Sequence, residues 1–81
     1  MYYVYILKSL KDNKYYIGST KHIEQRLAEH NQGKTKSLKY RLPLKLIYNE
    51  EYSTLLEARK RERKIKSYKG GNAFKKLIMG L

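Results

Sequence analysis

The spacing of apolar residues predicts three strands along this chain. Residues 2–10 are rich in aromatic and β-branched side chains, which strands favour, and residues 15–18 have the same character. The polar residues 11–14 between them are expected to form a turn, so the two segments should pair as a β-hairpin. Residues 44–52 have a similar composition and are expected to form a third strand.

Helical spacing predicts three helices in the rest of the chain, on either side of a basic loop at 32–43. Ile23 and Leu27 stand four residues apart within segment 21–31, as on one face of a helix. The longest helix is expected at 54–68 and a short terminal one at 73–79, with a glycine pair between them. The order ββαβαα predicts an α/β (α+β) sandwich, in which helices cover a three-stranded, mostly antiparallel sheet.

Length and composition narrow the class of protein. A chain of 81 residues has room for one domain, which we place over 1–81. It contains no cysteine, which excludes disulfides and thiolate metal sites. Its uncharged stretches are too short to span a bilayer, and the residues after Met1 do not have the pattern of a leader. We therefore expect a cytoplasmic protein without a membrane partner.

Positive charge is the strongest feature of the composition. The formal net charge is +12, with +5 carried by residues 1–40 and +7 by residues 41–81. A chain that tolerates such self-repulsion usually binds a polyanion, above all a nucleic acid backbone. The alternative is a lysine- and tyrosine-rich composition that reflects an AT-rich genome. Of the two, we expect a nucleic acid partner.

Two titratable side chains border the apolar stripe of the helix expected at 21–31. Arg26 and His30 fall within about 100° of Ile23 and Leu27 on a helical projection. The structural interpretation is that both reach solvent from the edge of the stripe. The functional interpretation is that they face a substrate, and this helix alone does not decide between the two.

A carboxylate interrupts the apolar stripe of the long helix. Glu62 lies four residues after Ala58 and three before Ile65, in the middle of that stripe. A buried carboxylate is costly unless it is paired or bound to a cation. It is therefore either a structural ion pair with a neighbouring arginine, or a metal ligand or acid–base group. Glu57 falls at the edge of the stripe and is expected to be solvated.

Two tyrosines of the predicted hairpin share a face of the sheet. A turn with Asp12 and Asn13 at its tip would pair Ser9 with Tyr16, and Tyr5 has the same parity as Ser9. Tyrosines at a spacing of two are more often packing residues than catalytic ones. This register also leaves the two phenols some distance apart, so that a bulge or a strong twist would be needed to bring them together.

Taken together, these positions resemble the GIY-YIG nuclease domain. Residues 3–5, Tyr-Val-Tyr, stand where the family has its first tripeptide, and residues 16–18 match the second. Segment 23–31 resembles the family helix that carries an arginine and a following histidine, and segment 57–62 ends at the position of the family glutamate. Nearly the whole chain is covered, and the likeness is strongest to the small stand-alone bacterial subgroup. Tyrosine and valine replace the glycine and isoleucine of the first tripeptide.

The resemblance implies a metal-dependent nuclease, and first of all an endonuclease, that hydrolyses phosphodiester bonds. We expect DNA as the substrate, although the sequence does not distinguish DNA from RNA. Glu62 would hold one Mg²⁺ or Mn²⁺, because these hard cations prefer carboxylate and water oxygens. Tyr5 resembles the family's general base, although a phenol of pKa about 10 would need help from neighbouring charges. Arg26 would bind the scissile phosphate, Tyr16 would orient the water or a phosphate oxygen, and His30 would relay a proton or contact phosphate.

The basic residues outside this set are expected to bind the nucleic acid backbone. They are Lys21, Lys34, Lys36, Lys39, Arg41, Arg59 and Arg63. Family nucleases usually take their target choice from a second domain, which we do not expect here. Specificity would then come from the basic surface or from a protein partner, or it would be low, and the oligomeric state stays open.

Two other classes of function compete with a nuclease. One is a non-catalytic basic module that binds DNA or RNA with the same fold, and the other is a basic structural protein associated with RNA or the ribosome. A binding module has no need of a carboxylate facing a polyanion. Glu62, together with Arg26 and the two tyrosines, therefore favours the nuclease.

Overall fold

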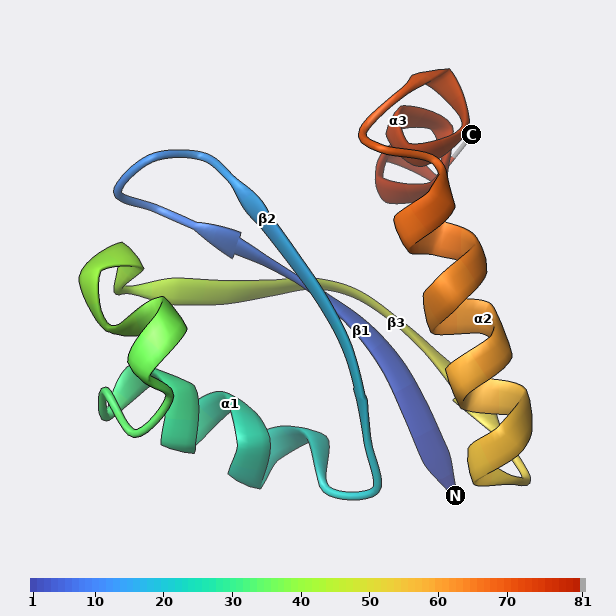
Figure 1. Cartoon of the computed structure of the whole chain (residues 1–81), viewed down its shortest axis with the longest axis horizontal. Helices are drawn as coiled ribbons and strands as arrows, with labels where there is room; N and C mark the ends of the chain where they lie inside the picture. The colour runs from blue at the N-terminus through green and yellow to red at the C-terminus, as the bar shows by residue number, and fades with distance from the viewer. Residues whose placement is uncertain (81) are drawn as a thin grey trace.

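The computed structural model describes residues 1–80 and follows the predicted order ββαβαα with one addition (Figure 1). The addition is a 3₁₀ helix inside the segment predicted to be a loop. No helix within residues 1–80 is long and apolar enough to cross a membrane. In chain order the elements are β1 (Tyr2–Ser9), β2 (Tyr15–Thr20), α1 (Ile23–Asn31), η1 (Lys36–Arg41), β3 (Leu44–Tyr52), α2 (Leu55–Ser67) and α3 (Asn72–Met79).

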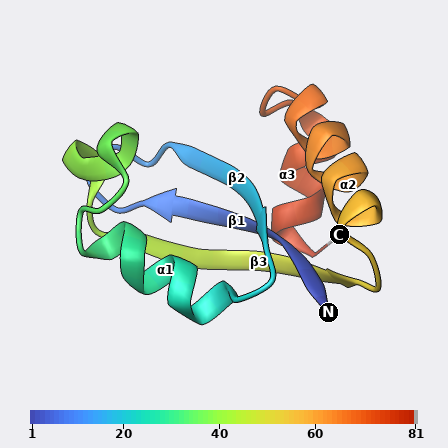
Figure 2. The same ribbon diagram turned by 60° about the horizontal axis from the view of Figure 1, so that its bottom comes forward.

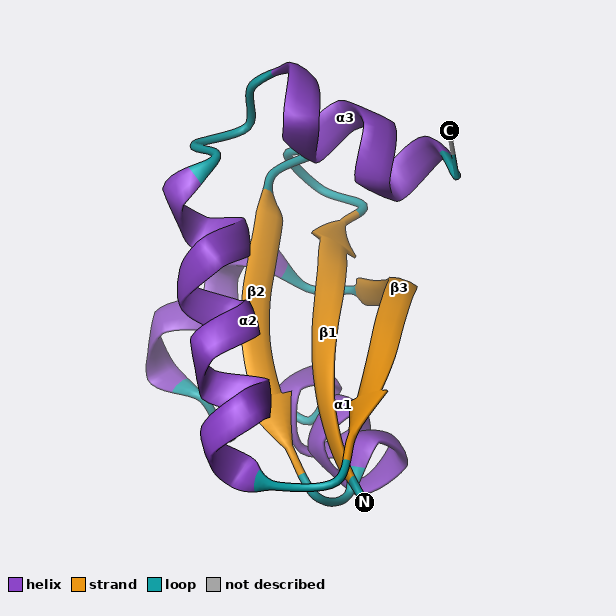
Figure 3. Cartoon of the chain, turned by 90° about the vertical axis from the view of Figure 1, so that its right-hand side faces the viewer, coloured by secondary structure: helices purple, strands orange, loops and turns teal. Residues whose placement is uncertain are grey.

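The three strands form one antiparallel sheet in the order β2-β1-β3, so that β2 is an edge strand. The predicted sandwich is confirmed, since α2 lies in front of the strands in Figure 3 and α1 lies behind them. η1 stands beside α1 at the end of the sheet away from α2 (Figure 2). The edge strand β2 therefore runs between helices that belong to opposite layers.

The central strand β1 is buried on both faces, which explains its nearly continuous apolar sequence. Val4 and Ile6 belong to a core cluster with residues of α2 and α3, among them Ala58 and Ile65. Tyr5 and Leu7 belong to a second cluster, which Leu38 of η1 completes from the other side. The sheet thus separates two thin cores, and side chains of β1 reach both.

The register of the hairpin differs from the prediction by two residues. Tyr16 lies opposite Leu7, not Ser9, and Tyr5 lies opposite Gly18. The turn closes earlier because the Ser9 hydroxyl accepts hydrogen bonds from the backbone N–H groups of residues 11 and 12, while the N–H of Ser9 donates to the carbonyl of Lys14 at 2.8 Å. As a result Tyr5 and Tyr16 come closer along the sheet, and the expected bulge between β1 and β2 is not needed.

An ion pair joins β3 to α2 on the face opposite α1. Arg61 donates from Nε and Nη2 to the two carboxylate oxygens of Glu50, at 2.9 and 3.1 Å. The hydroxyls of Tyr48 and Tyr52 donate to the same carboxylate. Burial alone would raise the pKa of Glu50, but these hydrogen bonds outweigh it and lower the pKa to about 2. The ionised form of this carboxylate therefore stabilises the fold.

Replacing Glu50 by glutamine is expected to lower the free energy of unfolding at pH 7 by about 3 kcal/mol. The pKa of Glu50 is depressed from 4.5, so its contribution is present above about that pH and is lost as the pH falls toward 2. Urea unfolding at pH 7 and pH 3 should show a large difference between the wild type and Glu50→Gln that shrinks at the lower pH. The control is Glu51→Gln, an exposed neighbour on the same strand, and equal losses in the two variants would contradict the assignment.

Candidate active site

A cleft of about 590 Å³ follows the outer edge of β2, between α1 and α2. Figure 1 shows these helices on the two sides of the strand. Side chains from both faces of the sheet meet there, because β2 has no neighbour on this side. The cleft brings together the five residues predicted to be catalytic, which come from β1, β2, α1 and α2: Tyr5, Tyr16, Arg26, His30 and Glu62.

Gly18 makes room for the ring of Tyr5. A Cβ atom at Gly18 would lie 2.4 Å from the Tyr5 hydroxyl oxygen and 2.6 Å from Cζ, closer than any side chain tolerates. The two residues are directly opposite in the β1–β2 ladder. The glycine is therefore required for a close approach of side chain to backbone. The sequence analysis did not name Gly18 as a site residue, although it ends the second tripeptide.

Replacing Gly18 by alanine is expected to cost about 1–3 kcal/mol of stability, because the added methyl group must displace a packed aromatic ring. A double-mutant cycle in urea tests the cause. On a Tyr5→Ala background the same methyl group should cost much less, whereas an equal cost on both backgrounds would show that the ring of Tyr5 is not responsible.

A chain of polar side chains runs from Tyr5 into the wall of the cleft. The Tyr5 hydroxyl lies 3.3 Å from Nε2 of His30, and Nδ1 of His30 lies 2.7 Å from the Thr35 hydroxyl. Tyr5 and His30 are 4% and 3% exposed. Burial, and then the charge of Arg26, lower the pKa of His30 despite an opposing effect of Glu29, so the imidazole is neutral at pH 7. In the tautomer with the proton on Nδ1, the lone pair of Nε2 faces Tyr5.

The hydroxyl of Tyr5 keeps its proton at neutral pH. Burial is the largest cause, followed by Tyr16, and together with Glu62 they outweigh Arg26 and raise the pKa of Tyr5 to about 12. A tyrosine that acts as a general base by itself would need the opposite shift, toward a lower pKa. The structure offers His30 as a proton acceptor within hydrogen-bond distance instead.

Glu62 supplies the one carboxylate among the described residues that line the cleft. It accepts a hydrogen bond of 2.6 Å from Nζ of Lys66, one helical turn away, and its side chain is 20% exposed. Burial raises the pKa of Glu62, but hydrogen bonds from Lys66 and Ser19 and the charge of Arg59 outweigh it, so the net shift is downward. The carboxylate is therefore ionised at neutral pH. Among the described residues its ion-pair partner is Lys66 and not the neighbouring arginine of the structural interpretation, and Arg61 pairs with Glu50.

The donor set fits a single hard cation with few protein ligands. Within residues 1–80 no three acidic, histidine or cysteine side chains converge on one point. Mg²⁺ and Mn²⁺ are commonly bound by one or two carboxylates, with water and substrate phosphate oxygens filling the remaining positions. Glu62, ionised and open to the cleft, is a suitable ligand of this kind.

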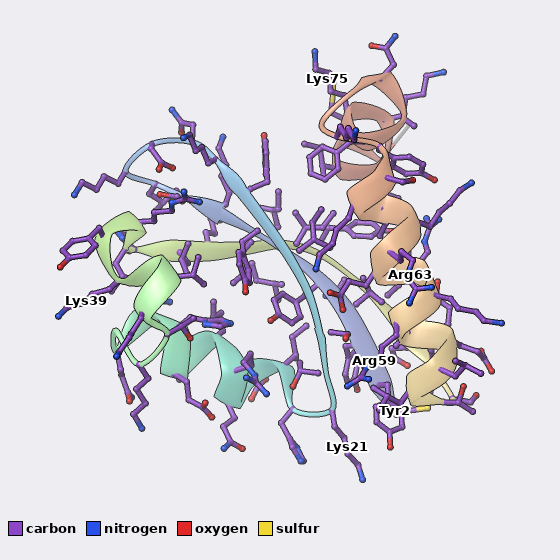
Figure 4. All side chains as sticks on the ribbon, in the orientation of Figure 1. Tyr2, Lys21, Lys39, Arg59, Arg63 and Lys75 are labelled. Carbon is purple, nitrogen blue, oxygen red and sulfur yellow. The ribbon has the colours of Figure 1, made fainter. Side chains whose placement is uncertain are left out.

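The residues predicted to bind backbone phosphates divide into two groups. Arg59 and Arg63 of α2 line the cleft, where Arg26 and Lys66 add two more positive charges. Figure 4 shows Arg59 and Arg63 on α2, whereas Lys21 and Lys39 lie toward other edges of the molecule. The five residues that do not line the cleft are Lys21, Lys34, Lys36, Lys39 and Arg41.

The charged side chains of segment 34–41 do not line the cleft, although the sequence predicts that they bind the nucleic acid backbone. Lys39 lies 5.9 Å from the ring centroid of Tyr40, and Arg41 lies 3.8 Å from the Asp12 carboxylate. Thr35 is the residue of this segment that lines the cleft. Thr35 and Lys66 were both missed by the sequence analysis; only Lys66 had a local signal, its spacing of four from Glu62.

Comparison with known proteins identifies the family to which the chain belongs. The model of the GIY-YIG catalytic domain matches residues 1–75 of the chain. The chain belongs to the GIY-YIG family. This GIY-YIG domain is 47% identical over 68 residues to UPF0213 protein SH2523 of Staphylococcus haemolyticus, a match that covers 83% of this chain and 82% of that one. UPF0213 protein SSP2268 of Staphylococcus saprophyticus is 44% identical over the same length and coverage.

A solved structure has the same fold. The solution NMR structure of UPF0213 protein BH0048 from Bacillus halodurans superimposes with a TM-score of 0.55 at 29% identity, covering 99% of this chain and 84% of that chain. Membership of the GIY-YIG nuclease family points to nuclease activity and to a nucleic acid substrate.

Proposed function

We propose that this GIY-YIG domain is a metal-dependent endonuclease that hydrolyses phosphodiester bonds in DNA. The observation that carries the proposal is the meeting of five residues from four elements in one cleft, with an ionised carboxylate among four basic side chains. A cleft that served only to bind a polyanion would gain affinity by losing that carboxylate.

Arg26 is proposed to hold the scissile phosphate. Its side chain is exposed and lines the cleft from α1, opposite Arg59 and Arg63 of α2. Guanidinium groups bind phosphate oxygens through two parallel hydrogen bonds, which fixes the orientation of the phosphate as well as its charge. A backbone lying in the cleft would thus be held from both sides of the β2 edge.

Tyr5 and His30 are proposed to remove the proton from the attacking water. The phenol oxygen would accept this proton while its own proton passes to Nε2 of His30, 3.3 Å away. The phenol then never has to exist as a free phenolate, which its raised pKa makes unfavourable. Thr35 is a positioning residue in this scheme, because its hydroxyl lies 2.7 Å from Nδ1 and would accept the Nδ1 proton in the tautomer that leaves Nε2 free for the tyrosine proton. Tyr16 of β2, which lies on the same face of the sheet as Tyr5, would orient the water.

Glu62 is proposed to hold Mg²⁺ or Mn²⁺. When bound, the cation neutralises charge on the phosphate and assists departure of the leaving oxygen. Lys66 donates a hydrogen bond to the same carboxylate. Its side chain is 53% exposed, so that it can turn into solvent or toward a phosphate when a cation arrives.

The test is cleavage of end-labelled duplex, branched and single-stranded DNA and of matching RNA, each with Mg²⁺, Mn²⁺ or EDTA. We expect metal-dependent cleavage of DNA and none with EDTA. Affinity measured in EDTA should fall with salt, by a log–log slope of roughly 0.9 per phosphate contacted on duplex DNA. Tight, salt-dependent binding without cleavage under any metal would replace the nuclease by a binding module.

A further inference from the structure

A second cavity of about 430 Å³ continues the cleft along β2. The two share Ile17 and Lys66 in their linings, and their lining residues run along the chain from Asn13 in the β1–β2 turn to Ser19 of β2. Figure 3 shows the α2–α3 turn and the β1–β2 turn at the same end of the sheet, and residues of both turns line this second cavity.

The second cavity combines an aromatic ring with a cationic rim. Tyr15 is 40% exposed, and its ring packs in a T-shaped arrangement with that of buried Phe74, with centroids 5.1 Å apart. Ile17 and Ile65 add apolar surface. The charged side chains that line it within the described chain are all basic: Lys14, Arg41, Lys66 and Lys69. Asp12, 3.8 Å from Arg41, offsets one of these charges.

We infer that this cavity binds an unpaired nucleotide of the same strand whose phosphate lies in the cleft. This inference rests on the proposed function. An exposed aromatic ring offers a stacking surface to a base, and basic side chains around it hold the flanking phosphates. A base inside a duplex is stacked on both faces and cannot use such a ring. The substrate would therefore carry a single-stranded segment next to the cleaved bond.

An acidic peptide is the other partner that aromatic and basic groups could attract. The continuity of the groove decides against it. A nucleic acid strand that follows β2 out of the cleft stays beside Lys66, which lines both cavities, before it reaches Tyr15. The basic and aromatic side chains of the second cavity thus suit the same nucleic acid strand that the neighbouring cleft is proposed to bind.

Binding in EDTA separates this inference from catalysis. Fluorescence anisotropy would compare a blunt duplex, the same duplex with a three-nucleotide tail, and the tail strand alone. We expect Tyr15→Ala to weaken binding of the tailed and single-stranded DNAs roughly 5- to 150-fold, the range for loss of one base-stacking ring. The blunt duplex should be affected far less, and Tyr15→Phe should bind like the wild type.

Tyr40→Ala is the matched control. Tyr40 is also exposed and also has a lysine about as far from its ring as Lys8 is from that of Tyr15, but it lies outside both cavities. Lys69→Asn supplies a second variant whose folding is safe, since residue 69 has a φ of 50° that asparagine tolerates well. It should weaken binding of the tailed DNA more than Lys75→Gln, a change on α3 outside the cavity (Figure 4).

Equal wild-type affinity for blunt and tailed DNA would overturn the inference, and so would equal losses on all three DNAs in Tyr15→Ala. If Tyr15→Ala does not fold in a thermal melt, Lys69→Asn decides. An acidic peptide that displaces tailed DNA from the wild type but not from Lys69→Asn would assign the cavity to a protein partner. If no DNA is cleaved in the presence of metal, the proposed function is wrong. The binding comparisons can still be interpreted in that case, because they are made in EDTA and do not depend on cleavage.

Discussion

Replacing Glu62 by glutamine is expected to reduce metal-dependent cleavage roughly a thousandfold or more, while the fold and DNA binding survive. The variant removes the one carboxylate that the described residues bring to the cleft, and with it the charge that would hold the cation. A bound metal ion contributes several kcal/mol to the stabilisation of a phosphoryl-transfer transition state, which corresponds to a loss of this size.

Stability should change little in Glu62→Gln. The carboxylate pairs with a lysine that is half exposed, and pairs of this kind usually contribute less than about 1 kcal/mol. DNA affinity in EDTA should stay the same or increase, because one negative charge leaves a basic cleft. The measurements are single-turnover cleavage under saturating Mg²⁺, a thermal melt and anisotropy in EDTA.

Glu57→Gln provides the matched control. Glu57 lies on the same helix but is exposed, as predicted, and outside the cleft. Its backbone N–H donates to the Thr54 side chain at the start of α2, and glutamine preserves that bond. Cleavage by Glu62→Gln at the wild-type rate would exclude Glu62 as the metal ligand. Unfolding of Glu62→Gln would instead make the carboxylate a structural pair.

The order of elements was predictable because each strand and helix has a local pattern. Aromatic and β-branched residues marked β1 before any partner was known, and the spacing of Ala58 and Ile65 marked the buried face of α2. Glu62 stood out for the same reason. It interrupts that face where α2 passes the open edge of β2, so it lies in a cleft and not in the core.

Features that depend on distant contacts were not predictable from those patterns. The register of the hairpin depends on what the Ser9 hydroxyl accepts, which a pattern of apolar residues does not contain. Thr35 reaches His30 only after the chain has turned past the end of α1. The partner of Arg61 lies on β3, 11 residues earlier, so composition alone could not assign it to Glu50 rather than Glu62.

Tyr5→Phe is expected to lower single-turnover cleavage by at least about a hundredfold, the lower end of the contribution of a positioned acid–base group. Phenylalanine keeps the ring that packs over Gly18, so the melting temperature should hold. Tyr3→Phe is the control, since it removes a hydroxyl from the same strand but outside the cleft.

The pH profile of the wild type distinguishes the proposed relay from a simple phenolate base. Because the pKa of His30 is lowered, the imidazole accepts a proton over the whole range above its ordinary pKa of 6.5. Cleavage should therefore fall only at acidic pH, as His30 becomes protonated, and should stay level from neutral pH up to about 9. A base that had to ionise with the Tyr5 pKa of about 12 would instead give a rate that rises tenfold per pH unit across this range. A rising profile, or full activity in Tyr5→Phe, would remove the tyrosine–histidine relay from the mechanism.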